Sequence, residues 1–338
     1  MTTGIRSLSL PRRLRLPLPL LLASVLLASG CGGSAGEKSG DAEGPAVKGF
    51  PVTVSNCGVK TTYERPPRRA VSLNQHATEV MLALGLEKSV IGTGYLDDAV
   101  LPAYRPAYDK IKVLAKEYPS YEALLAAEPD FVYGGFASTF DEKEGRSRDT
   151  FTKAGINTRL NGESCASGAV TMSMVDKEIR DVAKVFGVPE RAERQVKALH
   201  TTLDGVDGRL DGVDPVKLFV YDSGDKTAFT AGGTGIGNAM IERAGATNLF
   251  ADVDKAFGDV SFEQVADRAP DVILIYDYGD QTVEQKKKFL LTNPALRDVP
   301  AIKNERFAVL PLSSTVLGVR VPAAVESLAR QLHPERFR

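Results

Sequence analysis

The feature that most constrains the fold is a short unit that occurs twice, at residues 121–132 and 262–273. In both copies an aromatic residue is followed by Glu, by several helix-forming residues and by Pro-Asp, and an apolar run then begins. A helical stretch that ends at proline and leads into a continuous apolar run is typical of a helix that returns the chain to a buried parallel strand. Two copies predict two lobes of related build.

The rest of the chain repeats this alternation of strand and helix. Short apolar runs that end near glycine are followed by helical stretches such as residues 78–84 and 237–244. This pattern predicts an α/β fold of two Rossmann-like lobes with central, mainly parallel sheets. The predicted strands are residues 70–73, 89–92 and 130–133 in one lobe, and 217–221, 271–276 and 307–310 in the other.

A long amphipathic helix is predicted between the lobes, over residues 189–212. Pro189 suits the first helical turn, and apolar residues recur every three or four positions as far as Leu210. The alternative is a helix packed within one lobe, and Gly205 and Gly208 weaken the pattern at its C-terminal end. The predicted lobes are then residues 51–188 and 213–338.

The N-terminal residues predict export. A basic segment precedes an apolar stretch of residues 16–30, which contains two prolines and is too short for a membrane-spanning helix. Residues 27–31 resemble a bacterial lipobox, with Ala28 where leucine is usual. The resemblance implies that residues 1–30 are a signal peptide and that Cys31 is lipidated, anchoring the protein to the bacterial cell membrane; plain secretion is the alternative. Residues 31–50 are rich in Gly and Ser and predict a flexible tether.

Export also bears on the two other cysteines, Cys57 and Cys165. In an oxidising compartment an even pair favours a disulfide, and separately buried thiols are the alternative.

Composition narrows the function classes. Lys and Arg number 42 against 43 Asp and Glu, so no basic field indicates nucleic-acid binding. The three histidines are scattered along the chain and do not predict a multi-histidine metal site.

The sequence contains no clear match to a common catalytic or nucleotide-binding motif. Residues 233–237 read GTGIG, which is not the spacing of a dinucleotide-binding loop, and the chain has neither a phosphate-binding loop nor a nucleophile elbow. His76 has no recognisable nucleophile partner. We therefore expect a protein that is not an enzyme and has no catalytic residues; an exported hydrolytic lipoprotein is the alternative.

Ligands of open α/β lobes bind beyond the C-terminal ends of the strands. The residues at those ends are mostly aromatic or amide-bearing, which suits a bulky, partly apolar ligand with hydrogen-bonding groups. These candidate binding residues are Asn74, His76, Tyr95, Tyr133, Phe136, Tyr221, Tyr276, Tyr278 and Ser313.

In this order the motifs resemble the helical-backbone class of substrate-binding lipoproteins of ABC importers, which deliver ferric siderophores, haem and cobalamin. The resemblance covers residues 52–331. The motifs that carry it are residues 71–79 with 83–85, the first Glu-Pro-Asp unit, the glycine-rich 230–235 and residues 318–320. It implies a monomer that binds its ligand between the lobes and delivers it to permease subunits.

The resemblance also assigns roles to residues. Lys116 and Arg320 are expected to donate hydrogen bonds to the ligand, with Tyr133 and Tyr276 as walls of the cleft. Glu122 and Glu263, at equivalent places in the repeated unit, are expected to pair with arginines of the permease. Their alternative role is a favourable interaction with the helix dipole.

The expected ligand is a ferric siderophore, in which the chelate fills the coordination sphere of the iron. The protein then needs no metal ligand of its own and no cofactor. The predicted cleft loops mix Lys116, Lys226 and Arg320 with a larger number of aspartates, so a neutral or cationic ferric hydroxamate of the ferrioxamine type is favoured. Cobalamin or haem is the alternative.

Overall fold

The computed structural model describes residues 47–338, and Ala46–Arg338 form one compact unit. The predicted signal peptide, Cys31 and most of the tether lie outside the described residues. None of the helices in the described part is long and apolar enough to cross a membrane.

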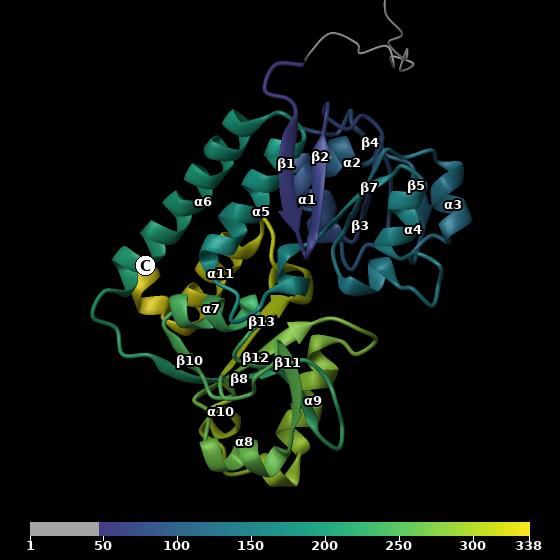
Figure 1. Cartoon of the computed structure of the whole chain (residues 1–338). Helices are drawn as coiled ribbons and strands as arrows, with labels where there is room; N and C mark the ends of the chain where they lie inside the picture. The colour runs from purple at the N-terminus through teal and green to yellow at the C-terminus, as the bar shows by residue number, and fades with distance from the viewer. Residues whose placement is uncertain (1–46) are drawn as a thin grey trace, which may run out of the picture. The chain divides into compact units, whose positions relative to one another are not determined.

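The N-terminal lobe is built on a five-stranded parallel sheet with the order β5-β4-β3-β6-β7 (Figure 1). An antiparallel hairpin of β1 and β2 precedes it. The strands are β1 (Val52–Asn56), β2 (Val59–Tyr63), β3 (Ala70–Leu73), β4 (Val90–Gly94), β5 (Val113–Ala115), β6 (Phe131–Gly134) and β7 (Asn157–Leu160). The helices are α1 (Gln75–Ala83), α2 (Arg105–Tyr108), α3 (Tyr121–Ala126), α4 (Arg148–Lys153) and α5 (Met172–Val185), with 3₁₀ turns at Ala137–Phe140 and Gly162–Cys165.

The C-terminal lobe has a four-stranded parallel sheet with the order β10-β8-β12-β13, and β9 pairs with β11 in an antiparallel ribbon. Its strands are β8 (Val216–Tyr221), β9 (Ala228–Ala231), β10 (Ala246–Asn248), β11 (Phe257–Val260), β12 (Val272–Asp277) and β13 (Phe307–Pro311). Its helices are α7 (Ile236–Arg243), α8 (Phe262–Arg268), α9 (Val283–Thr292), α10 (Pro300–Lys303) and α11 (Val321–Leu332). Short 3₁₀ turns cover Pro294–Leu296, Leu312–Ser314 and Pro334–Phe337. The predicted α/β class with parallel central sheets is confirmed.

The repeated unit forms the same structure in both lobes. A serine caps each helix: Ser120 Oγ accepts the Ala123 N–H at 3.2 Å, and Ser261 Oγ accepts the Gln264 N–H at 3.2 Å. The residue before each Pro-Asp has a positive φ, 51° at Glu128 and 49° at Ala269, which ends the helical stretch and turns the chain into the strand.

The aspartate of each Pro-Asp also ties two strands together. Asp130 accepts the backbone N–H groups of Arg68 and Arg69 at 2.8 and 2.9 Å, at the start of β3. Asp271 accepts the N–H of Lys217 at 3.1 Å, in β8. The central strand of each sheet is therefore aligned with its neighbour by the same side chain.

Helix α6 (Pro189–Leu210) leads from the first lobe into the second. Its buried face consists of Ala192, Val196, Leu199, Leu203 and Val206, as the spacing predicts, and it packs against α5 and α11. Both glycines lie within the helix.

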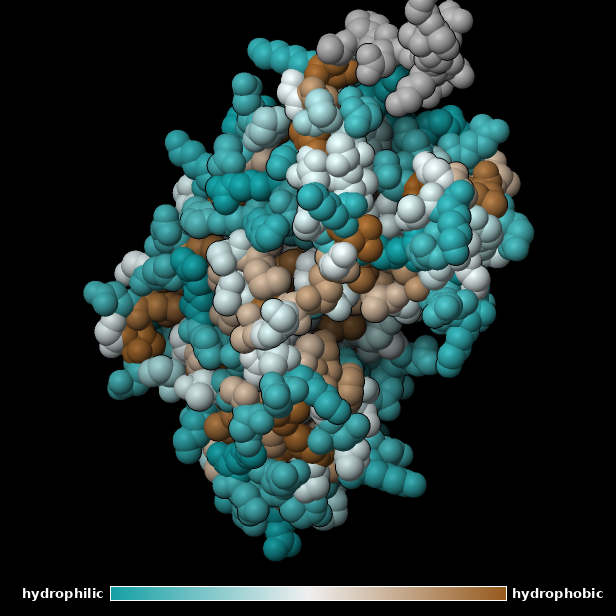
Figure 2. Space-filling model, viewed as in Figure 1, coloured by the Kyte–Doolittle hydropathy of each residue, from teal (hydrophilic) through white to brown (hydrophobic). Residues whose placement is uncertain are grey.

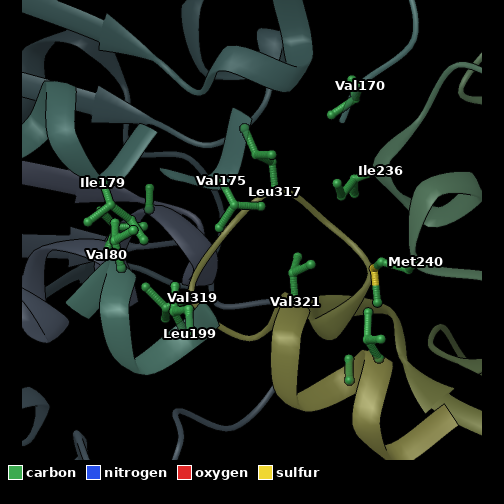
Figure 3. Packing of buried hydrophobic residues seen from close by; sticks show 14 of the residues in the cluster. Val80, Val170, Val175, Ile179, Leu199, Ile236, Met240, Leu317, Val319 and Val321 are labelled. Carbon is green, nitrogen blue, oxygen red and sulfur yellow. The ribbon is translucent and has the colours of Figure 1, made fainter. Parts of the chain in front are cut away.

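The lobes are joined by more than this helix, because one hydrophobic core runs through both. Figure 3 shows Val80 and Ile179 of the first lobe, Leu317 and Val319 of the segment before α11, and Met240 of α7 within that one cluster. The surface in Figure 2 is mainly hydrophilic, with a paler band of less polar residues across its middle.

Candidate functional site

The strand orders place one switch point in each lobe. β3 lies between β4 and β6, and β8 lies between β10 and β12. Later strands are therefore added on both sides of the central strand, and the place where the strand order reverses is the switch point of that sheet. Crevices beyond such points are where open α/β sheets bind ligands. Asn74 directly follows β3, and Asp222 directly follows β8.

Asn74 is fully buried and has a φ of 73°. Its Oδ1 accepts hydrogen bonds from the Tyr118 hydroxyl at 2.9 Å and from Thr139 Oγ1 at 3.3 Å. Its Nδ2 faces the Asp97 carboxylate, whose pKa is raised by desolvation and lowered in part by this contact, although the two groups are not in ideal hydrogen-bonding geometry. Asn74 and Asp97 therefore form the polar part of the site at this switch point.

An aromatic cluster borders this point. Tyr95, held at a φ of 51° directly after β4, packs on Tyr118 with ring centroids 4.5 Å apart. Tyr278, after β12 in the other lobe, is 39% exposed. Desolvation, followed by proximity to Tyr278, raises the pKa of Tyr95, so aromatic residues of both lobes lie near one another here.

His76 and Phe136 lie next to Asn74. Their rings meet edge to face with centroids 4.8 Å apart. His76 is buried, and desolvation lowers its pKa to about 4, so the imidazole is neutral at physiological pH. The ring packs on the backbone of Gly135, where a Cβ would collide with it. His76 shapes this wall of the site without charge.

Three predicted binding tyrosines are buried in the protein, and this is a correction to the sequence analysis. Tyr133, Tyr221 and Tyr276 are at most 1% exposed. The Tyr133 hydroxyl donates to Glu178 Oε1 at 2.5 Å, and the Tyr221 hydroxyl donates to the Gly224 carbonyl at 2.7 Å. Each ring belongs to a hydrophobic core, because both faces of these parallel strands are covered.

Arg320 is expected from the sequence to donate hydrogen bonds to the ligand, but in the structure its donors are already bonded within the protein. Its Nε and Nη2 donate to the buried Glu79 carboxylate at 2.6 and 2.7 Å. The remaining N–H groups donate to Ala99 O, Ser313 Oγ and Asp98 Oδ2. All five guanidinium donors are thus engaged, and Arg320 ties α1 of the first lobe to the start of α11.

Ser313 and Lys116 have different surroundings. Ser313 is buried, and its Oγ donates to Asp98 Oδ2 at 2.9 Å, so it belongs to the same link between the lobes. Lys116 is exposed directly after β5, at the same sheet edge as Tyr95.

Sequence reasoning missed Tyr118 and Glu163. Tyr118 follows β5, a strand of three residues, which is too short to detect from its pattern. Glu163 accepts the N–H groups of Ile236 and Leu317 at 2.9 and 2.7 Å, and burial raises its pKa. This carboxylate joins the first lobe to α7 and to the segment before α11.

The C-terminal lobe contains a hollow of about 430 Å³ beside Asp222. It lies at the ends of β8 and β12 and is lined by Asp222, Asp225, Tyr278, Asp280, Gln281 and Lys286, together with Ser223 and two glycines. Among the described residues there is no group of three or more His, Cys, Asp or Glu side chains that could hold a metal ion.

Glu122 and Glu263 are exposed in the first turns of α3 and α8, one in each lobe. Backbone and Ser261 hydrogen bonds lower the pKa of Glu263. Cys57 and Cys165 form a disulfide with a Cα–Cα distance of 5.3 Å, which joins the β1–β2 turn to the segment that holds Glu163.

Comparison with known proteins identifies the family. A model of the family described as periplasmic binding protein matches residues 71–313, so the chain belongs to that family. The "Uncharacterized ABC transporter substrate-binding lipoprotein YvrC" of Bacillus subtilis is 26% identical over 324 residues, covering 94% of this chain and 96% of that protein.

Solved structures agree with this assignment. A periplasmic binding protein from Veillonella parvula is 31% identical with a TM-score of 0.77, over 84% of this chain and 97% of that one. A structure from Saccharomonospora viridis described as an ABC-type Fe3+-hydroxamate transport system is 25% identical with a TM-score of 0.71, over 84% and 99% of the two chains. These relatives are substrate-binding transport proteins.

Proposed function

We propose that this protein captures a ferric siderophore, of the neutral or cationic hydroxamate type, between its two lobes and delivers it to an ABC permease. The observation that carries the proposal is the aromatic cluster of Tyr95, Tyr118 and Tyr278, drawn from both lobes at the switch points. Aromatic faces suit the organic surface of a large chelate. The name of the Saccharomonospora viridis protein supports the same ligand class.

The charges around the cluster favour a ligand that is not anionic. Asp97 and Asp98 follow Tyr95, and Asp222 and Asp225 follow β8. Arg320, which could have countered them, is bound to Glu79 and Asp98. A catecholate chelate of high negative charge would meet mainly carboxylates here.

The proposal is tested by titrating residues 46–338, which form a compact unit with their own hydrophobic cores. Tyrosine fluorescence is the readout, since the chain has no tryptophan. We expect submicromolar binding of a ferric trihydroxamate and weak binding of a ferric catecholate, haem and cobalamin. If the protein binds the catecholate, haem or cobalamin tightly but does not bind the trihydroxamate, the proposed ligand class is wrong.

A matched pair of variants tests the site itself. Tyr278 and Leu291 are both 39% exposed in the C-terminal lobe, but only Tyr278 borders the hollow and the aromatic cluster. Tyr278→Ala should weaken trihydroxamate binding about tenfold, whereas Leu291→Ala should leave it unchanged. Equal affinities would place the ligand elsewhere.

We further propose that Glu122 and Glu263 dock the protein on the two permease subunits. One exposed glutamate at the same helical position in each lobe suits a partner with twofold symmetry, because charge pairs at a rim orient a complex. The double change to Ala should abolish uptake of the iron chelate by cells but spare binding. Asp149 and Glu284, also in first helical turns and one in each lobe, provide the control pair. If cells with Ala at both Glu122 and Glu263 take up the chelate normally, the two glutamates only stabilise their own helices.

The predicted lipid anchor on Cys31 completes the proposal. The name of YvrC, a lipoprotein, supports it. Cys31→Ser should release the protein from bacterial membranes and end its labelling by radioactive palmitate. Membrane retention of the variant would refute lipidation at this position.

A further inference from the structure

Asp222 occupies the same place in the C-terminal sheet as Asn74 in the N-terminal sheet, directly after the central strand. Both side chains are buried, and each has one polar atom without a hydrogen-bond partner among the described residues. In Asn74 this atom is a donor, Nδ2, and in Asp222 it is an acceptor, Oδ1. The two positions therefore differ in kind: Nδ2 of Asn74 faces the Asp97 carboxylate, whereas no donor faces Oδ1 of Asp222 among the described residues.

Asp222 is only 8% exposed, and its Oδ2 accepts a hydrogen bond from Ser223 Oγ at 3.2 Å. The nearest cation, Lys286, is held by the backbone: its Nζ donates to the carbonyls of Tyr276 and Tyr278 at 2.7 and 2.9 Å. Lys286 attracts the Asp222 carboxylate electrostatically, but no donor among the described residues forms a hydrogen bond with Asp222 Oδ1. A buried carboxylate oxygen without a donor is costly, and a bound group that donates to it would remove that cost.

The hollow beside Asp222 has the charge and size for an organic cation. Three aspartates line it, Asp222, Asp225 and Asp280, against the one ammonium group of Lys286. Its volume of about 430 Å³ exceeds what a single ion or water fills. Tyr278 lines the hollow and also lies near Tyr95, so one ligand can reach the hollow and the aromatic cluster together.

We propose that this acidic hollow is a subsite for a protonated primary amine on an arm of the ligand, with the Asp222 carboxylate, turned toward the hollow when the ligand binds, as its principal acceptor. The proposal rests on the proposed function, since it assigns one part of the same chelate. The ammonium group donates a charge-assisted hydrogen bond to Asp222, Asp225 and Asp280 add an attractive field, and the ring of Tyr278 covers the alkyl arm.

The test compares two chelates that differ only at the arm: a linear ferric trihydroxamate with one free primary amine, and its N-acetylated form. Residues 46–338 should bind the amine form at least tenfold more tightly, as a charge-assisted hydrogen bond implies. Asp222→Asn should reduce this preference to threefold or less and leave the affinity for the acetylated chelate within about twofold. Calorimetry measures all affinities.

Asp254→Asn is the matched control, because Asp254 is exposed in the same lobe and its change removes the same charge. Asp254→Asn should keep the full preference for the amine chelate over the acetylated chelate. Asp280→Asn, at the exposed edge of the hollow, should lower that preference about twofold to threefold. It replaces Asp222→Asn in the test if Asp222→Asn does not fold.

The outcomes separate the two proposals. If neither chelate binds, the proposed function is wrong. If both chelates bind tightly and equally, the proposed function stands and the amine subsite is wrong. An equal loss of preference in Asp222→Asn and Asp254→Asn would show that net charge alone acts, and would also overturn the subsite.

Discussion

Removing the Arg320 side chain provides a sharp test of how the lobes are held together. Arg320 is 7% exposed, and its carboxylate partner, Glu79, is fully buried. Arg320→Ala leaves Glu79 without a counter-ion in the core. Breaking a buried pair in this way costs about 3–5 kcal/mol of unfolding free energy. For a domain of this size we expect a fall in Tm of about 6–20 °C.

The chain offers a matched control at its surface. Arg180 makes a similar two-bond contact with Glu193, at 2.8 and 2.9 Å, but both side chains are largely exposed. Arg180→Ala should therefore cost about 1 kcal/mol or less. Urea unfolding followed by circular dichroism measures both variants.

A second change tests the cause of the loss. Glu79→Gln in the Arg320→Ala background removes the unpaired charge and should restore part of the lost stability. If Arg320→Ala costs no more than Arg180→Ala, or if Glu79→Gln lowers stability further, the buried charge is not what the guanidinium compensates.

Three further predictions concern other parts of the fold. Cys57→Ser with Cys165→Ser opens a link between residues 108 positions apart and should lower the unfolding free energy by about 4–5 kcal/mol in urea titrations, with reductant producing the same loss in the parent protein. Gly135→Ala should cost about 1–3 kcal/mol because a Cβ has no space there, whereas Gly168→Ala, with open space around it, should be neutral in the same assay. His76 has a pKa of about 4 in the fold against 6.5 unfolded, so only the unfolded chain gains a proton as pH falls from 6.5 toward 4; stability should drop by about 3 kcal/mol over that window, and His76→Gln should abolish this part of the pH dependence.

Several features of this protein follow from local sequence. The helix over Pro189–Leu210 was predictable because its apolar residues repeat with the period of a helix. The repeated unit was predictable because its aromatic residue, glutamate and Pro-Asp recur in the same order before an apolar run. In the structure, serines cap α3 and α8, and a residue with positive φ follows each helical stretch, all within a few residues along the chain. The aspartates bind the backbone of residues 54 to 62 positions earlier, which the local pattern does not predict.

The orientation of the tyrosines was not predictable in this way. Tyr133, Tyr221 and Tyr276 stand at strand ends, as the sequence indicates, but their rings enter the cores. Which face of a strand is covered by helices depends on sheet order and crossover, and a shift of one residue exchanges the faces. Tyr118 reached the site only because β5 pairs at the edge of the sheet.

Local sequence thus determines the strand-and-helix alternation, the longer apolar strands and the helix over Pro189–Leu210, because these depend on interactions between neighbours in sequence. Only the tertiary structure decides which side chains meet across long separations. Arg320 and Glu79 are 241 residues apart, and no local pattern marks them as partners. Asn74 and Asp222 acquire their buried places at the two switch points from the sheet order, which no local pattern encodes.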